Sequence, residues 1–369
     1  MAEPAPIPEE WLAGLASAAR EERLALLRRL LAQGFSIDEL ERAIAEDRLV
    51  LLGIERVFGA VLSAEEIERR TGVPAARLSR ARRLLGLPEP EPGERVFTEE
   101  DVAAAEAIKL FTDAGIDQDA IDETTAVLGE GMARLAATID AQFLQTFLRA
   151  GESEQEAAER LALIAQELTP AFRPVLMSAF TAQLRASVAR GVLGSEQLSS
   201  GQPPAEQVVA VCFVDMVGFT RLGVELEVLE LGAIARQLAR LAATVVSPPA
   251  RLIKTIGDAA MFVSPDPAAL VEVALDLLDG AAAEDLPVLR AGIAYGPSVE
   301  RAGDFYGNTV NLASRVTGVA RPGSVLCTAE VHDAAAETFD WSFAGRHRLK
   351  GVSRPAPLHR ARRAVTSRP

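Results

Sequence analysis

Two acidic residues stand where a folded chain could hold a metal ion. Asp215 ends an apolar run in the string VVAVCFVDMVGFT, and Asp258 lies in the string RLIKTIGDAAMFVS. Short hydrophobic runs flank Asp258, which predicts a β-hairpin with this acid at its tip. Magnesium is commonly held by one or two carboxylates together with substrate phosphates, so the pair predicts a divalent-metal site. Taken alone, each acid also fits a turn or a cap.

A third string, ERAGDFYGNTVNLASRVTGVARPG, carries Asp304 near its start. It continues as a predicted helix over Thr309–Val319, with Asn308 as the N-cap. Asn311 and Arg315 are four residues apart and share one face of this helix. Both side chains donate hydrogen bonds, which suits a phosphate whose negative charge grows during a reaction. As an isolated pair they would also fit an ordinary solvated surface.

These three strings, in this order, resemble the class III nucleotidyl cyclases, the adenylyl and guanylyl cyclase homology domain. The resemblance covers about residues 206–362 and implies an α+β fold with a ferredoxin-like βαββαβ core. It also implies a homodimer in which the chains pair head to tail and share active sites at their interface. By this resemblance, Asp215 and Asp258 bind two metal ions per site, Mg²⁺ or Mn²⁺.

The resemblance assigns the remaining four residues as two pairs. Lys254 and Asp304 match the pair that selects adenine, and Asn311 and Arg315 match the pair that stabilises the transition state. A lysine can donate to adenine N1 and an aspartate can accept from the exocyclic amine, whereas guanine presents the reverse pattern. Sites that hydrogen-bond one base reject another because buried polar groups would be left unpaired.

The activity implied is that of an adenylate cyclase, which converts ATP to 3′,5′-cyclic AMP and pyrophosphate. A guanylate cyclase is the alternative among enzymes of this kind. A diguanylate cyclase would carry a Gly-Gly-Asp-Glu-Phe hairpin, where this chain reads Ile-Gly-Asp-Ala-Ala. A third alternative is a transcription regulator that uses a DNA-binding segment in the first half, with the cyclase fold as its sensor.

The elements that must position these residues follow a change in composition near residue 195. Gly, Ser, Gln and Pro dominate residues 196–205, which predicts a linker. Before it, Ala, Leu, Glu and Arg are typical of an all-α domain, 1–195; after it, Val-rich runs alternate with helical runs in a catalytic domain, 206–369. The first 205 residues hold 21 basic and 34 acidic residues, so the acidic charge belongs mostly to the helical half.

The helical half contains a segment, residues 63–102, that resembles a MerR-type helix-turn-helix. It has seven basic and nine acidic residues, whereas a duplex-binding element presents a positive excess, so no DNA contact is expected. Ser36, Ser63 and Thr98 each precede an acidic residue at helix-start spacing. Pro170–Leu193 is predicted as a helix with an apolar stripe that leads into the linker.

The whole half, residues 1 to about 195, is similar to the helical regulatory domain found ahead of some cyclases and described there as pH-sensing. No histidine lies in residues 1–331, although histidine is the usual switch near neutral pH. We expect this half to regulate the catalytic half, as an autoinhibitor.

Composition restricts where the protein works. Of the 369 residues, 49% are hydrophobic and 24% charged, which is ordinary for a soluble globular protein. No run of about 18 apolar residues predicts a membrane span. An acidic N-terminus and only two cysteines favour a cytoplasmic protein with reduced thiols.

Overall fold

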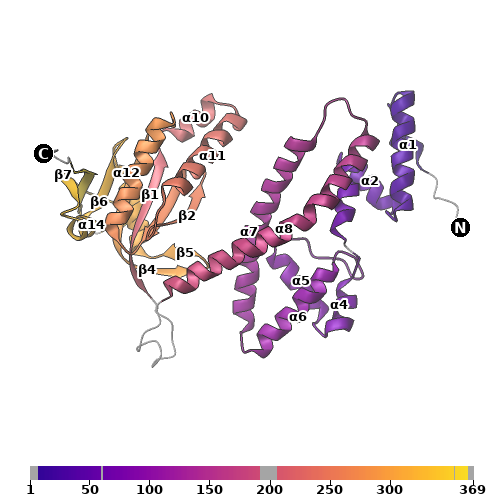
Figure 1. Ribbon diagram of the computed structural model, residues 1–369, viewed down its shortest axis with the longest axis horizontal. Helices are drawn as coiled ribbons and strands as arrows, with labels where there is room; N and C mark the ends of the chain where they lie inside the picture. The colour runs from indigo at the N-terminus through magenta and orange to yellow at the C-terminus, as the bar shows by residue number, and fades with distance from the viewer. Residues whose placement is uncertain (1–6, 60, 192–205, 353, 365–369) are drawn as a thin grey trace. The chain divides into compact units, whose positions relative to one another are not determined.

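The computed structural model describes residues 7–59, 61–191, 206–352 and 354–364. The chain divides into two units, Met1–Gly191 and Val192–Pro369, each of which is described by itself (Figure 1). The predicted linker, 196–205, lies outside the described residues. Among the residues that are described, no helix combines the length and the apolar character needed to cross a membrane.

The regular elements among the described residues of the first unit are all helices, and one isolated β-bridge joins Leu62 to Phe97. The predicted helix starts at Ser36, Ser63 and Thr98 are confirmed, because each side chain accepts from the backbone of the third helical residue in a capping box. Its elements are η1 (Glu9–Leu12), α1 (Ser17–Ala32), α2 (Ile37–Ala45), η2 (Leu49–Leu51), α3 (Leu52–Glu55), η3 (Arg56–Phe58), α4 (Ala64–Thr71), α5 (Ala75–Leu84), α6 (Glu99–Asp113), α7 (Gln118–Phe147) and α8 (Glu154–Arg190).

The prediction of a helix beginning at Pro170 was wrong. The helix there, α8, begins at Glu154 with Ser153 as its cap, and Pro170 lies inside it. A proline at a helix start is common because its missing N–H is not needed there, which made Pro170 a misleading signal. The predicted end, Leu193, lies outside the described residues.

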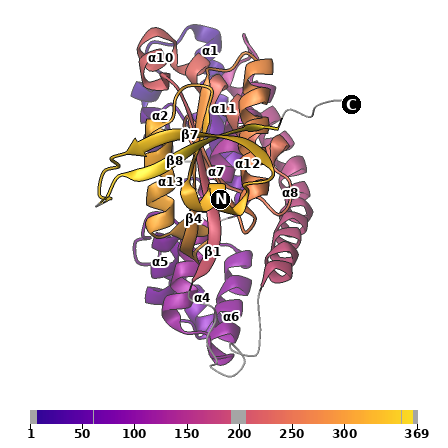
Figure 2. The same cartoon turned by 90° about the vertical axis from the view of Figure 1, so that its left-hand side faces the viewer.

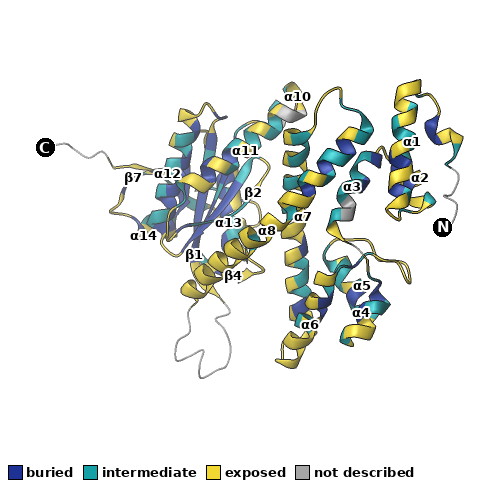
Figure 3. Ribbon diagram, turned by 45° about the vertical axis from the view of Figure 1, so that its right-hand side comes forward, coloured by how far each residue is buried: buried dark blue, intermediate teal, exposed yellow. Residues whose placement is uncertain are grey.

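The first half of α8 is packed, and the second half is exposed. Leu161 is fully buried and belongs to the part of α8 that contacts α1 and α3. After Phe172, every described position of α8 except Leu176 is exposed, as the yellow ribbon in Figure 3 shows. Isolated helices are marginal in water, so a helix of this kind depends on further packing.

The second unit is built on one mixed sheet. Its strands follow the order β2-β3-β1-β4-β6-β8-β7, with β5 paired to β4. The strands are β1 (Gln207–Met216), β2 (Arg251–Ile256), β3 (Ala259–Ser264), β4 (Leu289–Arg301), β5 (Asp304–Tyr306), β6 (Val325–Thr328), β7 (Phe339–His347) and β8 (Ala356–Arg363). The helices are α10 (Phe219–Glu225), α11 (Val228–Val245), α12 (Pro267–Ala283), α13 (Asn308–Val319) and α14 (Ala329–Ala334).

The first four strands and two of the helices form the predicted βαββαβ core. Along the chain they run β1, α11, β2, β3, α12 and β4, and in the sheet they lie in the order β2-β3-β1-β4, all antiparallel. Strands β4 and β6 are parallel, and the chain crosses between them through α13.

Side chains on the two faces of the sheet enter separate cores. Cys212 and Val214 of β1 face a core shared with α11, α12 and α14, whereas Val211 and Phe213 face α13. Figure 2 shows α12 and α13 on opposite sides of the sheet. Because side chains alternate along a strand, Asp215 projects toward the α13 side.

Helix α13 approaches the sheet at Gly292 of β4. A Cβ added at Gly292 would lie 2.1 Å from the backbone nitrogen of Thr317. Thr317 is buried, and its hydroxyl donates to the carbonyl oxygens of Phe213 (3.2 Å) and Ala313 (2.9 Å). The absence of a side chain at Gly292 therefore sets how closely α13 sits on β1 and β4.

We expect Gly292→Ala to destabilise the catalytic unit by about 3 kcal/mol, at the upper end of typical overpacking costs, because the backbone of α13 must move to admit a methyl group. Thermal unfolding of the full-length protein measures this. Gly318→Ala is the matched control. Gly318 lies on α13 next to Thr317, and a Cβ added there meets nothing within 4 Å. Equal melting temperatures for the two variants would contradict the close approach.

Candidate active site

The two predicted metal ligands lie next to each other at one end of the sheet. Asp215 is the penultimate residue of β1, and Asp258 lies in the turn between β2 and β3. The Met216 N–H donates to the Asp258 carbonyl oxygen at 3.1 Å, which ties the end of β1 to that turn. The predicted hairpin is present, with β2 and β3 antiparallel on either side of the turn.

The electrostatics of Asp258 favour a cation. Burial raises the pKa of the Asp258 carboxyl, the negative charge of Asp215 raises it further, and Arg290 lowers it. A carboxyl group whose ionisation is disfavoured by burial and by a neighbouring carboxylate is a setting in which a divalent cation fits. Among the described residues no group of three or more His, Cys, Asp or Glu side chains could hold a metal. The pair therefore fits Mg²⁺ or Mn²⁺, which take the rest of their oxygen ligands from water or substrate phosphates.

Arg290 is a site residue that the sequence analysis missed. It lies opposite Asp215 in the β1–β4 register, and its Nη2 and Nε lie 2.6 and 3.1 Å from Asp215 Oδ2. Its Nη1 donates to the Gly318 carbonyl oxygen of α13 at 3.3 Å. The signal that could have singled it out is an arginine within the otherwise apolar string VLRAGIAY.

Lys254 and Asp304 meet in the structure. The Lys254 ammonium group of β2 donates to Asp304 Oδ2, and the Phe305 backbone N–H donates to Oδ1 at 2.9 Å. Both charged side chains are about 30% exposed, at 32% and 28%. These residues are 50 positions apart, and the contact places a donor and an acceptor side by side, as recognition of a heterocycle edge requires.

Asn311 and Arg315 lie on α13, one turn apart, as predicted. The cap is Gly307, not Asn308: α13 begins at Asn308, and Gly307 precedes it with φ of 137°. The shift of one residue arises because glycine reaches this conformation without strain, so no side-chain cap is needed.

Arg315 is half-buried, and Asn311 is exposed. A Cβ added at Gly351 would lie 3.3 Å from Arg315 Nη2, so the backbone of the segment before β8 lies against the guanidinium group. In the part of the chain that the structure describes, Arg315 makes no ion pair, which leaves its donors available to an anion.

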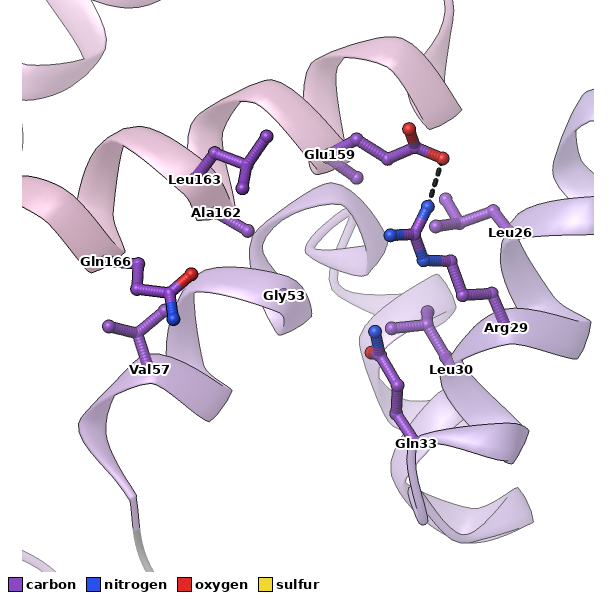
Figure 4. Close-up of a pocket in the computed structure, with 11 residues that line it drawn as sticks. Leu26, Arg29, Leu30, Gln33, Gly53, Val57, Glu159, Ala162, Leu163 and Gln166 are labelled. Carbon is purple, nitrogen blue, oxygen red and sulfur yellow. Dashed lines mark hydrogen bonds and ion pairs between the residues drawn. The ribbon is translucent and has the colours of Figure 1, made fainter.

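The structure therefore brings the six predicted residues together as three pairs: two carboxylates, a lysine–aspartate ion pair, and an asparagine and arginine on one helix. A cavity of about 380 Å³ in the helical unit is lined by none of these six residues (Figure 4). It is bordered by Leu30, Gly53 and Leu163, and an ion pair between Arg29 and Glu159 lies on its rim.

Comparison with known proteins follows the same division of the chain. Residues 6–188 match the family described as adenylate cyclase regulatory domain, and residues 202–360 match the adenylate and guanylate cyclase catalytic domain. A pH-sensitive adenylate cyclase of Mycobacterium tuberculosis is 37% identical over 369 residues, 97% of this chain and 92% of that protein. An adenylate cyclase of Streptomyces coelicolor is 32% identical over 290 residues, 76% of this chain and 74% of that protein.

A crystal structure of the adenylyl cyclase CyaB from P. aeruginosa covers 44% of this chain and 98% of that chain, at 20% identity and a TM-score of 0.38. The identity to the mycobacterial protein extends across nearly the whole of both chains. The chain therefore belongs to the class III adenylate cyclase family, as an enzyme in which the cyclase catalytic domain follows a regulatory domain of the kind found in adenylate cyclases.

Proposed function

We propose that this enzyme converts ATP to 3′,5′-cyclic AMP and pyrophosphate. The observation that carries the choice of substrate is the contact between Lys254 and Asp304. In this proposal the ammonium group donates to adenine N1 and the carboxylate accepts from the exocyclic amine. The adenylate cyclase names of relatives with 37% and 32% identity support the same substrate.

The reaction joins the ribose 3′-oxygen to the α-phosphorus, while the bond from that phosphorus to the pyrophosphate oxygen breaks. We assign Asp215 and Asp258 as the ligands of two divalent cations, Mg²⁺ or Mn²⁺. When bound, such cations make the 3′-hydroxyl more acidic and neutralise phosphate charge. Asn311 and Arg315 then donate to phosphate oxygens as negative charge develops, which is the main work left to a protein in phosphoryl chemistry.

We propose that the catalytic centre forms between two copies of the chain. In the family pattern, the metal carboxylates come from one chain and the Asn–Arg pair from the other. The helical unit supports a dimer on separate grounds, because the second half of α8 carries large apolar side chains that are 38–72% exposed. These are Phe172, Val175, Met177, Phe180, Leu184 and Val188.

Helix α7 has the same feature. Val127, Leu128 and Met132 are 41–53% exposed, and few of its 30 residues are buried. A second copy would supply the packing that long helices of this kind need. We also propose a cytoplasmic location, because Cys212 and Cys327 are buried and free, as thiols are in a reducing compartment.

Base selectivity tests the substrate assignment against the alternative of a guanylate cyclase. We expect Lys254→Glu combined with Asp304→Cys to lower ATP turnover by at least about 100-fold, because both contacts to adenine become mismatched. The measurement is turnover of ATP and GTP, each with Mg²⁺ and with Mn²⁺. Unchanged preference for ATP in the double variant would remove the basis of the assignment.

We retain the MerR-like interpretation of residues 63–102 as a structural element. Within it, α4 and α5 are short helices joined through Gly72, and Arg70, Arg80 and Arg83 are paired with carboxylates. Arginines that are already paired have less charge to offer phosphate groups. A transcription regulator would instead bind DNA with an affinity that falls steeply as salt rises.

We propose that the helical unit restrains the catalytic unit. Small changes in how two chains meet at a shared site cost large factors in rate, so biasing two arrangements of the dimer is enough to control activity. We expect deletion of residues 1–195 to raise specific activity several-fold. Activity is measured at matched dimer concentration and at several pH values. Equal activities of the two forms would make the first unit a passive dimerisation domain.

A further inference from the structure

The contact between Arg290 and Asp215 is imposed by the fold. The two residues are direct partners in the β1–β4 ladder, and β1 and β4 lie in the middle of the sheet. The Arg290 and Asp215 side chains are 28% and 26% exposed, so the ion pair is half-buried. Such a charge-assisted contact is stronger than the ordinary surface pairs of this protein, whose side chains move freely in water.

Arg290 is surrounded by negative charge from three elements. Asp215 comes from β1, Asp258 comes from the β2–β3 turn and lies within electrostatic range of both Asp215 and Arg290, and the Gly318 carbonyl comes from the last turn of α13. Carbonyl oxygens at the end of a helix carry partial negative charge. The positive charge of the guanidinium group therefore offsets the negative charge of the two proposed metal ligands, Asp215 and Asp258.

We propose that Arg290 neutralises the carboxylates while no metal is bound and competes with the divalent cation for Asp215. This proposal rests on the proposed function, in which Asp215 and Asp258 hold the metal. A metal ion and a guanidinium group both need the Asp215 oxygens, and their positive charges repel each other. When it releases Asp215, Arg290 keeps the Gly318 carbonyl as a hydrogen-bond acceptor, so the guanidinium group is not left without a partner.

The alternative role for Arg290 has the opposite sign. If its contact only oriented the Asp215 carboxylate for the metal, removing the guanidinium group would weaken metal binding. If Arg290 competes with the metal, removing it strengthens metal binding. The affinity of the protein for the cation in the absence of nucleotide therefore distinguishes the two roles without reference to turnover.

The test is Mn²⁺ binding to the full-length, nucleotide-free protein, followed by the electron paramagnetic resonance signal of free Mn²⁺. We expect Arg290→Gln to bind Mn²⁺ at least about tenfold more tightly, the factor that corresponds to one charged hydrogen bond. Arg290→Lys keeps the positive charge but loses part of the contact with Asp215, so its affinity for Mn²⁺ should rise by a few-fold, less than that of Arg290→Gln. Arg240→Gln is the matched control, because it breaks an ion pair between Arg240 of α11 and Glu284, the residue that follows α12, and neither residue is one of the proposed site residues.

Unchanged or weaker Mn²⁺ binding by Arg290→Gln would overturn the proposal. Should Arg290→Gln fail to fold, Arg290→Lys decides, because a lysine reaches the carboxylate through a single ammonium group and lacks the second contact to α13. A gain in affinity of a few-fold supports competition, and a loss overturns it. A different result would show that the proposed function is wrong. If Asp215 is not a metal ligand, Asp215→Asn would bind Mn²⁺ as tightly as the wild type.

Discussion

Asp215→Ala and Asp258→Ala should each reduce ATP turnover by at least about 1000-fold, because the loss of even one group that stabilises developing charge costs on the order of 10²–10³ in rate. Asp215 lies at the end of β1 and Asp258 in the adjoining turn, so both carboxylates reach the same volume. Neither side chain is part of a hydrophobic core. Both variants should therefore stay folded while activity is lost, although Asp215→Ala also loses the ion pair with Arg290 and its melting temperature should fall more. Turnover with Mg²⁺ and thermal unfolding measure the two effects separately.

Asp279→Asn is the matched control for these variants. Asp279 lies on α12, where its carboxylate is 73% exposed and pairs with Arg363. It should keep the turnover of the wild type. Near wild-type turnover by either Asp215→Ala or Asp258→Ala would mean that the assignment of the two acids as metal ligands is wrong, whatever the control shows.

The sequence predicted much of the catalytic unit because its signals are local. Apolar runs interrupted by Asp215 and Asp258 mark where strands end, and the spacing of Asn311 and Arg315 places them on one helix face. The alternation of such runs indicated mixed α and β structure, and the resemblance to cyclases implied the βαββαβ order. Asp304 could not be paired with Lys254 from spacing alone, because 50 residues separate them; the resemblance to cyclases suggested that pairing, and the structure shows the contact.

What the sequence did not predict depends on tertiary contacts. Arg290 becomes informative only once the β1–β4 register places it opposite Asp215. The length of α8 was underestimated because Pro170 suggests a helix start, whereas the helix begins at Glu154, contacts α1 and α3 and continues past that proline. The cap at Gly307 was missed because the backbone conformation between β5 and α13 determines which residue is the N-cap, and that conformation is not evident from the sequence.

Mixing two inactive variants should restore activity if the catalytic centre is shared between chains. An Asp215→Ala chain keeps Arg315, and an Arg315→Ala chain keeps Asp215. In a heterodimer of the two, one site contains Asp215 from one chain and Arg315 from the other, both intact. The other site contains both substitutions. Random reassortment of equal amounts makes half of the dimers mixed, so activity should recover to about one quarter of the wild-type value.

The structure makes this outcome a discriminating one. Arg315 lies on α13 with no ion pair inside its own described chain, and Asp215 pairs with Arg290 instead of Arg315. If Arg315 worked together with Asp215 of its own chain, mixing the two variants would restore no activity. The assay is turnover after co-refolding, with heterodimers shown by two affinity tags and with two differently tagged Asp215→Ala chains as the control mixture. Confirmed heterodimers without recovered activity would place each catalytic centre within one chain.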